Sequence, residues 1–278
     1  ITSPVAGFNV SEVEPSSESV HSPAINICSL VISRAKRKHL KASPLRVVLI
    51  SKQEQPQIMA KRIGIADATT TKVTGRPPIL VLIAGATGVG KSTTAVKIAN
   101  EHSFARLLST DAIREIMRVQ NTNENHALNR SSFSRGEAGD AVLDWQDTCK
   151  AVEAGILATI ERARREGIDL ILEGVHLEPS SRLLRSWRDS GGIAVGIVMH
   201  VDDEEQHAGF LKQREIHSFR NAERYISALP RIRAIQDSLK EKSRIADWNT
   251  LDATVVKDSL ERVNHWLDLA WNDWRKSR

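Results

Sequence analysis

The sequence that decides the fold is Gly85-Ala86-Thr87-Gly88-Val89-Gly90-Lys91-Ser92, which fits the pattern Gly-x-x-x-x-Gly-Lys-Ser. The residues before it, 79–84, are all apolar and are typical of a buried parallel strand. The residues after it, 93–100, carry apolar side chains at helical spacing. Strand, glycine-rich loop and helix therefore follow one another in the order that a phosphate-binding loop requires. We call residues 85–92 the phosphate loop.

The glycines of the phosphate loop allow successive backbone N–H groups to turn toward one point, where the next helix adds its positive dipole. A nucleoside triphosphate suits such a site, so we expect ATP and Mg²⁺ as cofactors. Lys91 is expected to reach the β- and γ-phosphates, and the Ser92 hydroxyl to bind Mg²⁺. The predicted nucleotide-binding residues are Gly85, Ala86, Thr87, Gly88, Val89, Gly90, Lys91, Ser92 and Thr93.

Composition limits the class of protein. The 278 residues are 41% apolar, which is enough for one main domain. The net charge of +5 fits an anionic small substrate or a nucleic acid, but the arginines are spread along the chain. Two cysteines without metal-ligand spacing predict reduced thiols, a cytoplasmic location and no structural zinc. No apolar run approaches the roughly 20 residues that span a bilayer, so no membrane segment is expected. A removed targeting segment and the oligomeric state are left open.

The chain is expected to contain four parts. Residues 1–24 are rich in Ser, Glu and Pro and are predicted to be a disordered leader. Residues 25–66 combine apolar clusters with a basic run and are typical of a small module or a helical prefix. Residues 67–78 are predicted to be a linker, and residues 79–278 to form the domain that holds the phosphate loop.

From residue 79 onward, strand-like and helix-like segments alternate, which predicts an α/β fold with a three-layer parallel sheet after a short N-terminal extension. The clearest helix carries core residues from Val142 to Ala163 and ends at Gly167. A second helix is expected to begin near Pro230, and a last helix to bury residues between 260 and 274. The expected strands are 79–84, 106–109, 169–172, 193–199 and 253–256.

Polar residues follow three of these strands, at the edge where open parallel sheets bind ligands. Asp111 and Arg114 come after strand 106–109 and lie one helical turn apart. The Asp111 carboxylate can then face an acceptor hydroxyl while the Arg114 guanidinium holds an anionic group of the same substrate. The alternative is that Asp111 is only a helix N-cap and that Arg114 is a solvated first-turn residue.

Glu173 and His176 follow the next strand, and residues 200–203 follow the fourth. Glu173 can hold Mg²⁺ through water or orient the attacking hydroxyl. His176 can donate to a substrate phosphate, or it can merely fill the end of the strand.

Two further segments are candidates for substrate contact. Segment 203–224 is polar and contains arginines, which is typical of a mobile lid over the transferring phosphoryl group. Within it we predict that Arg214 is catalytic and that Arg220 binds substrate, the alternative being that both are surface arginines. Residues between 119 and 136 are expected to form a substrate loop.

Four segments together resemble the 2-phosphoglycerate kinase family. They are the phosphate loop, residues 109–118 (STDAIREIMR), residues 173–179 (EGVHLEP), and residues 224–225 leading to 230–236 (PRIRAIQ). The resemblance spans about residues 79 to 250 and implies a P-loop kinase fold. It also implies transfer of the ATP γ-phosphate to the 3-hydroxyl of 2-phosphoglycerate, giving 2,3-bisphosphoglycerate. Plant relatives are linked to inositol-phosphate metabolism.

The expected function is therefore an ATP- and Mg²⁺-dependent kinase of a phosphorylated hydroxy acid, with 2-phosphoglycerate as the first choice of acceptor. One alternative is a kinase of an inositol phosphate or a nucleic-acid end, and another is a regulatory nucleotide-binding protein without catalysis. The expected partner is a small anionic phosphorylated substrate, not a nucleic acid or a membrane. The predicted catalytic residues are Lys91, Asp111 and Arg214; the substrate-binding residues are Asp111, Arg114, Glu173, His176 and Arg220; the metal-binding residues are Ser92 and Glu173.

Overall fold

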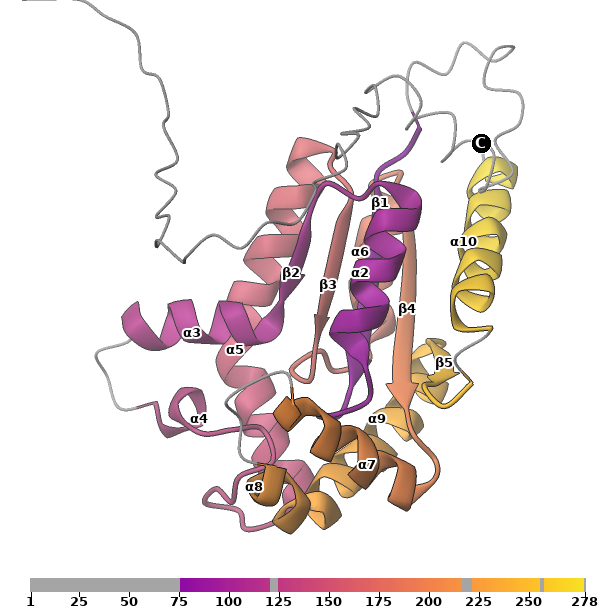
Figure 1. Ribbon diagram of the computed structural model, residues 1–278. Coiled ribbons are helices and arrows are strands. Elements are labelled where there is room, and N and C mark those ends of the chain that lie inside the picture. Colours follow the sequence, from indigo (N-terminus) through magenta and orange to yellow (C-terminus); the bar gives the residue numbers. More distant parts are fainter. Residues whose placement is uncertain (1–75, 121–124, 217–221, 256–257, 278) are drawn as a thin grey trace, which may run out of the picture. The chain divides into compact units, whose positions relative to one another are not determined.

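Five parallel strands form the sheet at the centre of the described chain (Figure 1). The computed structural model describes residues 76–120, 125–216, 222–255 and 258–277. The expected leader, the expected N-terminal module and most of the expected linker therefore lie outside the described residues. The strands are β1 (Ile79–Gly85), β2 (Leu107–Ser109), β3 (Leu170–Gly174), β4 (Ile193–His200) and β5 (Asn249–Asp252).

The strand order is β2-β3-β1-β4-β5, so the strands that follow β1 lie first on one side of it and then on the other. Such a reversal opens a crevice at the carboxyl ends of the strands, where ligands of α/β sheets bind. The phosphate loop follows β1 directly and therefore lies at this crevice. Strands β1, β3 and β4 are buried along their whole length, as expected for a parallel sheet covered on both faces. The predicted α/β fold with a parallel sheet is confirmed.

Helices cover both faces of the sheet. Helix α2 crosses in front of it in Figure 1 and α6 lies behind it, while α7 and α8 lie beyond the ends toward which the strands run. The helices are α2 (Lys91–His102), α3 (Thr110–Gln120), α4 (His126–Asn129), α5 (Ala141–Glu166), α6 (Ser181–Asp189), α7 (Glu204–Ile216), α8 (Ala222–Ser227), α9 (Leu229–Ala246) and α10 (Ser259–Lys276).

Helix α5 is the long helix that the apolar spacing predicted. Its N-cap, Asp140, accepts hydrogen bonds from the backbone of the first turn, and its C-cap, Gly167, adopts φ 61°. Glycine reaches that left-handed conformation without the strain that a side chain would add. The predicted core residues of α5 are buried, except Val142, which is half-buried. Helix α9 also begins as predicted, with Pro230 in its first turn.

The prediction of a strand at 253–256 is wrong, because β5 comes earlier and ends at Asp252. β5 pairs only with β4, and Leu251 is its one fully buried residue, so the strand lacks an apolar run that would mark it. The Asp252 carboxylate accepts hydrogen bonds from the backbone N–H and the hydroxyl of Thr254. This turn stops the strand before the apolar residues that suggested the later position.

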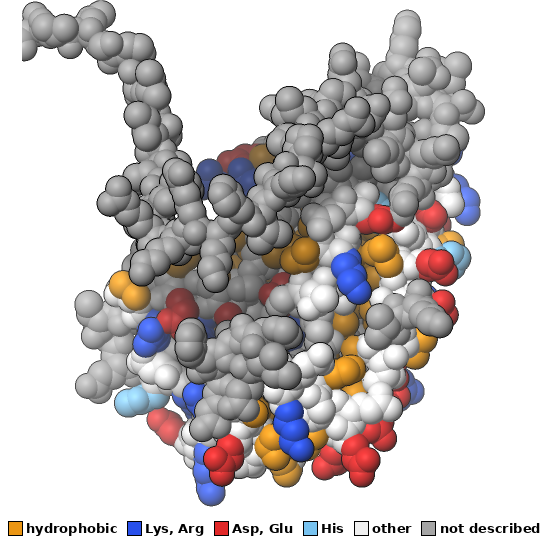
Figure 2. All heavy atoms as spheres, viewed as in Figure 1, with side chains coloured by type: hydrophobic (Ala, Val, Ile, Leu, Met, Phe, Trp, Pro, Cys, Tyr) orange, Lys and Arg blue, Asp and Glu red, His pale blue; other side chains and the backbone are white. Residues whose placement is uncertain are grey.

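On the face shown in Figure 2, acidic and basic side chains of the described residues are interspersed. The described residues visible on that face form no continuous basic track of the kind that follows a nucleic-acid backbone. In the described part of the chain, every helix is too short or too polar to cross a membrane.

Candidate active site

The phosphate loop has the conformation that its glycines allow. At Gly85 an added Cβ would lie 2.6 Å from the carbonyl oxygen of Met199, so β4 approaches the loop too closely for a side chain. Gly90 precedes α2 with φ 81°, a left-handed conformation. The Lys91 ammonium donates a hydrogen bond to the Ala86 carbonyl, 2.8 Å away, across the loop. Of the other predicted nucleotide-binding residues, Val89 is buried, Thr87 and Gly88 are half-buried, and Ser92 and Thr93 are exposed.

Ser92 and Glu173 meet at the start of α2. The Ser92 hydroxyl donates a hydrogen bond of 2.9 Å to the Glu173 carboxylate, which is 5% exposed. Although 81 residues separate them in the chain, β1 and β3 are neighbours and bring the two together. A hydroxyl and a carboxylate are oxygen ligands that Mg²⁺ prefers, so this pair fits the predicted metal site.

His176 is buried behind the end of β3. Its Nδ1 lies 3.0 Å from the Thr110 hydroxyl and 3.8 Å from the Asp111 carboxylate. Burial lowers the pKa of His176 to about 4; the charge of Asp111 opposes this shift, while the positive charges of Arg114 and Lys91 reinforce it. The imidazole is therefore neutral near pH 7. With a side chain that is 0% exposed, His176 contacts these neighbours and not solvent.

Asp111 lies in the first turn of α3, and 63% of its side chain is exposed. The N-cap bond of this helix is made by Ser109, whose hydroxyl accepts from the Ala112 backbone at 3.1 Å. The Asp111 carboxylate is thus not occupied by helix capping. It is open on the side away from His176, where an acceptor hydroxyl can approach.

Arg114 lies one turn farther along α3 and is largely buried, with 17% of its side chain exposed. One of its nitrogens donates to the Arg130 backbone carbonyl, and another pairs with the Glu115 carboxylate, both at 3.0 Å. The guanidinium is therefore held by protein groups on two sides. An anionic substrate group would compete with the half-exposed Glu115 for it.

Gly174 lies against Thr110 in this part of the site, so its substitution should lower the free energy of unfolding. A Cβ added at Gly174 would lie 1.8 Å from the Thr110 hydroxyl, so Gly174→Ala must push Thr110 away from His176. We expect a loss of about 2 kcal/mol in the free energy of unfolding, measured by denaturant titration. The control is Gly209→Ala in α7, where an added Cβ meets no described atom within 4 Å outside the helix backbone. That variant should gain about 0.5–1 kcal/mol. Equal stability of the two variants would contradict the close packing.

The expected lid contains two helices in the described chain, α7 and α8. The first of them packs against the phosphate loop: buried His207 bonds the Thr87 carbonyl at 2.8 Å, and buried Leu211 lies against Gly88. Sequence reasoning missed His207, because one histidine in a polar helix gives no signal of its own. The side chain of Arg214 and the whole of Arg220 lie outside the described residues, so their roles stay predictions.

The expected substrate loop packs onto α8. The Arg224 guanidinium donates to the Ser131 hydroxyl at 2.7 Å and lies 5.5 Å from the centre of the Phe133 ring. Tyr225 also packs on Phe133, with their ring centres 5.3 Å apart. Residues 121–124 of this segment lie outside the described chain.

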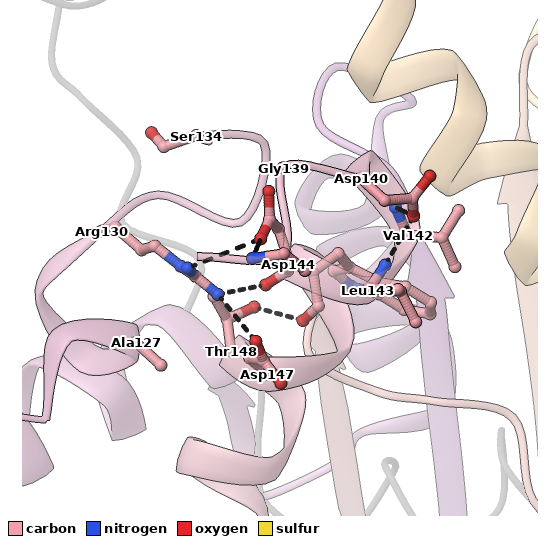
Figure 3. Close-up of polar contacts among 12 residues, drawn as sticks. Ala127, Arg130, Ser134, Gly139, Asp140, Val142, Leu143, Asp144, Asp147 and Thr148 are labelled. Atoms are coloured by element: carbon pink, nitrogen blue, oxygen red, sulfur yellow. Dashed lines mark hydrogen bonds and ion pairs between the residues drawn. The ribbon is translucent and has the colours of Figure 1, made fainter. Parts of the chain in front are cut away.

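Asp144 is a fully buried carboxylate that ties the same loop to α5 and α9. Figure 3 shows the Arg130 guanidinium reaching to Asp144 and to the neighbouring Asp147. On the other side, Arg231 of α9 donates to the Asp144 carboxylate at 2.7 Å and to the Phe133 carbonyl at 2.9 Å. The two arginines and Asp144 therefore fix the loop that leads from α4 into α5.

Removal of this carboxylate should destabilise the fold. Asp144→Ala leaves two largely buried guanidinium groups without their shared partner, and we expect a loss of about 3 kcal/mol in the free energy of unfolding. Asp147→Ala is the control: Asp147 is 45% exposed and contacts Arg130 at 3.6 Å, so its loss should cost less than about 1 kcal/mol. Urea denaturation measures both, and a loss at Asp144 no larger than at Asp147 would be the contrary result.

The Asp144 carboxylate should also make the stability of the fold depend on pH in the acidic range. Burial acts to raise the pKa of Asp144, but its hydrogen bonds and the two arginines outweigh burial and hold the pKa below the ordinary 3.8. The pKa of Asp144 is lower in the native protein than in the unfolded chain. The contribution of its carboxylate to the free energy of unfolding is therefore complete above pH 3.8 and is lost as the pH falls through the native pKa.

The end of the fourth strand carries a different arrangement. His200 Nδ1 lies 2.9 Å from the Asp202 carboxylate, which also accepts from Lys240 at 2.6 Å. Hydrogen bonding to Lys240 is the main cause that lowers the pKa of Asp202. Asp252 lies close by, so the three side chains have the donor types of a metal site, but Lys240 already supplies a cation there. These residues join β4, β5 and α9.

The chain matches a known family of domains and is similar to curated 2-phosphoglycerate kinases. Residues 80–262 match the AAA_33 family model, described as an AAA domain. A 2-phosphoglycerate kinase of Methanothermobacter thermautotrophicus is 30% identical over 66% of this chain and 65% of its own. A 2-phosphoglycerate kinase of Methanocaldococcus jannaschii is 34% identical over 68% of this chain and 63% of its own. The chain thus spans less than two thirds of the length of these relatives. The similarity to 2-phosphoglycerate kinases that the motifs indicated is confirmed.

Among solved structures, a gluconokinase from Sinorhizobium meliloti 1021 aligns with a TM-score of 0.45 and 16% identity, covering 73% of this chain and all of its own. A shikimate kinase from Aquifex aeolicus aligns with a TM-score of 0.37 and 12% identity, over 67% of this chain and 96% of its own.

Proposed function

Since the chain belongs to the AAA_33 family of AAA domains, we propose that it is an ATP- and Mg²⁺-dependent kinase that transfers the γ-phosphate to a hydroxyl of a phosphorylated hydroxy acid. The first choice of acceptor is 2-phosphoglycerate, which would give 2,3-bisphosphoglycerate. The names of the curated relatives support this choice.

The observation that carries the proposal is that the end of β3 contacts both the phosphate loop and the start of α3. The Glu173 carboxylate accepts a hydrogen bond from Ser92 at 2.9 Å, and the imidazole of His176, three residues later, lies 3.8 Å from the Asp111 carboxylate. A carboxylate suited to an acceptor hydroxyl therefore lies near the loop suited to a triphosphate. A protein that only bound nucleotide would not need the exposed carboxylate.

Each side chain has a role in the proposed transfer. The Asp111 carboxylate accepts the proton of the acceptor hydroxyl as that oxygen bonds to the γ-phosphorus and the bond from phosphorus to the ADP oxygen breaks. Lys91 holds the β- and γ-phosphate oxygens, and Arg114 holds the anionic group of the acceptor. Positioning and charge neutralisation supply most of the catalysis in phosphoryl transfer, so these placements matter more than covalent chemistry.

The hydroxyl of Ser92 and the carboxylate of Glu173 would hold Mg²⁺. A metal held there would supply positive charge that neutralises the phosphates of the nucleotide. The hydrogen bond between the two side chains keeps both oxygens in place at the start of α2.

The test is a transfer assay with ATP labelled at the γ-phosphate, Mg²⁺ and separate acceptors: 2-phosphoglycerate, other phosphorylated hydroxy acids, inositol phosphates and oligonucleotides with free ends. We expect label in the phosphorylated acids, with 2-phosphoglycerate the best of them. Label only in an inositol phosphate or an oligonucleotide would refute the acceptor class. Nucleotide binding without transfer to any acceptor would refute the kinase proposal and favour a regulatory protein.

A further inference from the structure

We infer that His207 of α7 is a positioning residue of the phosphate loop: it holds the Thr87 carbonyl and so orients the Gly88 N–H toward the nucleotide phosphates. The inference rests on the proposed nucleotide site and adds to it a residue outside the loop. Helix α7 would then contribute to nucleotide binding through its contact with the phosphate loop.

The hydrogen bond defines the state of the imidazole. His207 is 0% exposed, and its Nε2 lies 2.8 Å from the Thr87 carbonyl oxygen. A carbonyl only accepts, so Nε2 carries the proton and donates. Burial is the main cause that lowers the pKa of His207; the nearby charges of Arg233 and Lys91 lower it as well, while the Thr87 bond and Glu204 oppose the shift. The ring is therefore neutral, with Nδ1 as its buried acceptor.

Peptide geometry carries this contact to the loop. The peptide bond between Thr87 and Gly88 is trans, as are all others described, so its C=O and N–H point in opposite directions. When His207 holds the carbonyl, the Gly88 N–H must point away from α7. A phosphate loop binds anions through backbone N–H groups that converge on one point, so the direction of each peptide decides whether its N–H contributes.

Leu211 holds the same peptide from the next turn of α7. Residues four apart lie on one face of a helix, and Leu211 is fully buried beside Gly88. An added Cβ at Gly88 would lie 2.5 Å from the Leu211 side chain, and Gly88 has φ 93°. A hydrogen bond and an apolar contact thus both join α7 to the Thr87–Gly88 peptide.

Helix α7 is itself anchored where His207 lies. The Asp203 carboxylate accepts from the Gln206 backbone at 2.7 Å, and the Asp203 carbonyl accepts from the His207 backbone at 3.1 Å. Glu204 pairs with Arg233 of α9 at 3.5 Å. These contacts fix the first turn of α7, so the backbone of His207 is held in place beside the phosphate loop.

The experiment compares the affinity for Mg²⁺ and ATP, by titration calorimetry, in four variants of the full chain. His207→Leu removes the donor. His207→Asn keeps an N–H donor on a side chain that is too short to reach the Thr87 carbonyl. His207→Gln keeps a donor nitrogen near the position of Nε2. Gln206→Leu, on the exposed side of the same turn, is the control. Thermal unfolding of each variant without nucleotide separates loss of fold from loss of affinity.

We expect His207→Leu and His207→Asn to weaken nucleotide binding about tenfold, while His207→Gln and Gln206→Leu stay within about threefold of the original protein. Folded Leu and Asn variants that bind as tightly as the Gln variant would overturn the inference. If the Leu variant does not fold, the comparison of Gln with Asn decides in the same way. Failure of the original protein to bind ATP would instead refute the proposed nucleotide site.

Discussion

Replacement of Lys91 by alanine is expected to reduce phosphoryl transfer to every acceptor by about 10³-fold or more. The ammonium of Lys91, the first residue of α2, reaches across the phosphate loop and donates to the Ala86 carbonyl. In the proposed function it holds the β- and γ-phosphate oxygens of ATP. Alanine removes that charge and its hydrogen bond but leaves the glycine backbone of the loop in place. The rate of transfer from γ-labelled ATP measures the effect.

Lys97→Ala is the matched control, because Lys97 is exposed on the same helix and away from its N-terminus. It should transfer phosphate at the original rate. A folded Lys91→Ala variant within tenfold of that rate would show that the loop does not bind the transferred phosphate as proposed.

Replacement of Asp111 by asparagine should separate binding from turnover. Asparagine keeps the shape of the side chain but cannot accept the acceptor proton, and we expect turnover to fall by about 10²- to 10⁴-fold. ATP affinity should change little, because the carboxylate of Asp111 is 63% exposed and is proposed to contact the acceptor hydroxyl and not the nucleotide. Calorimetry with ATP and steady-state kinetics with the best acceptor measure the two quantities.

Asp237→Asn, at an exposed position of α9, controls for the loss of one surface charge. Two results would contradict the assignment. Unchanged turnover in Asp111→Asn would remove Asp111 as the proton acceptor, and an equal loss of ATP affinity would make it a nucleotide-binding residue instead.

The inner strands of the sheet could be predicted from the sequence because β1, β3 and β4 are buried on both faces and are therefore mainly apolar. The phosphate loop was equally plain, since its glycines and its lysine have fixed spacing for physical reasons. Edge strand β5 was misplaced because one buried residue, Leu251, leaves no pattern to detect. Edge strand β2, in contrast, lies within the expected range 106–109, so local periodicity locates a strand only where apolar residues mark it.

The site divides in the same way. Asp111, Glu173 and His176 could be located because each lies at or just after the end of a strand, and the ends of parallel strands meet at one edge. The contacts that fix the neighbouring loops could not be located, because contacts between residues far apart in the chain leave no local pattern. Asp144 and Arg231 are 87 residues apart, and Thr87 and His207 are 120 apart.

We propose that a triphosphate and an acceptor bind side by side at the carboxyl end of β1. A single-turnover measurement can decide this, with the protein in excess over γ-labelled ATP and with Mg²⁺ and 2-phosphoglycerate present. We expect the label to move into a doubly phosphorylated acid with the original protein and to remain in ATP with Asp111→Asn. Label found only in free phosphate, or left in bound ATP with the original protein, would contradict it.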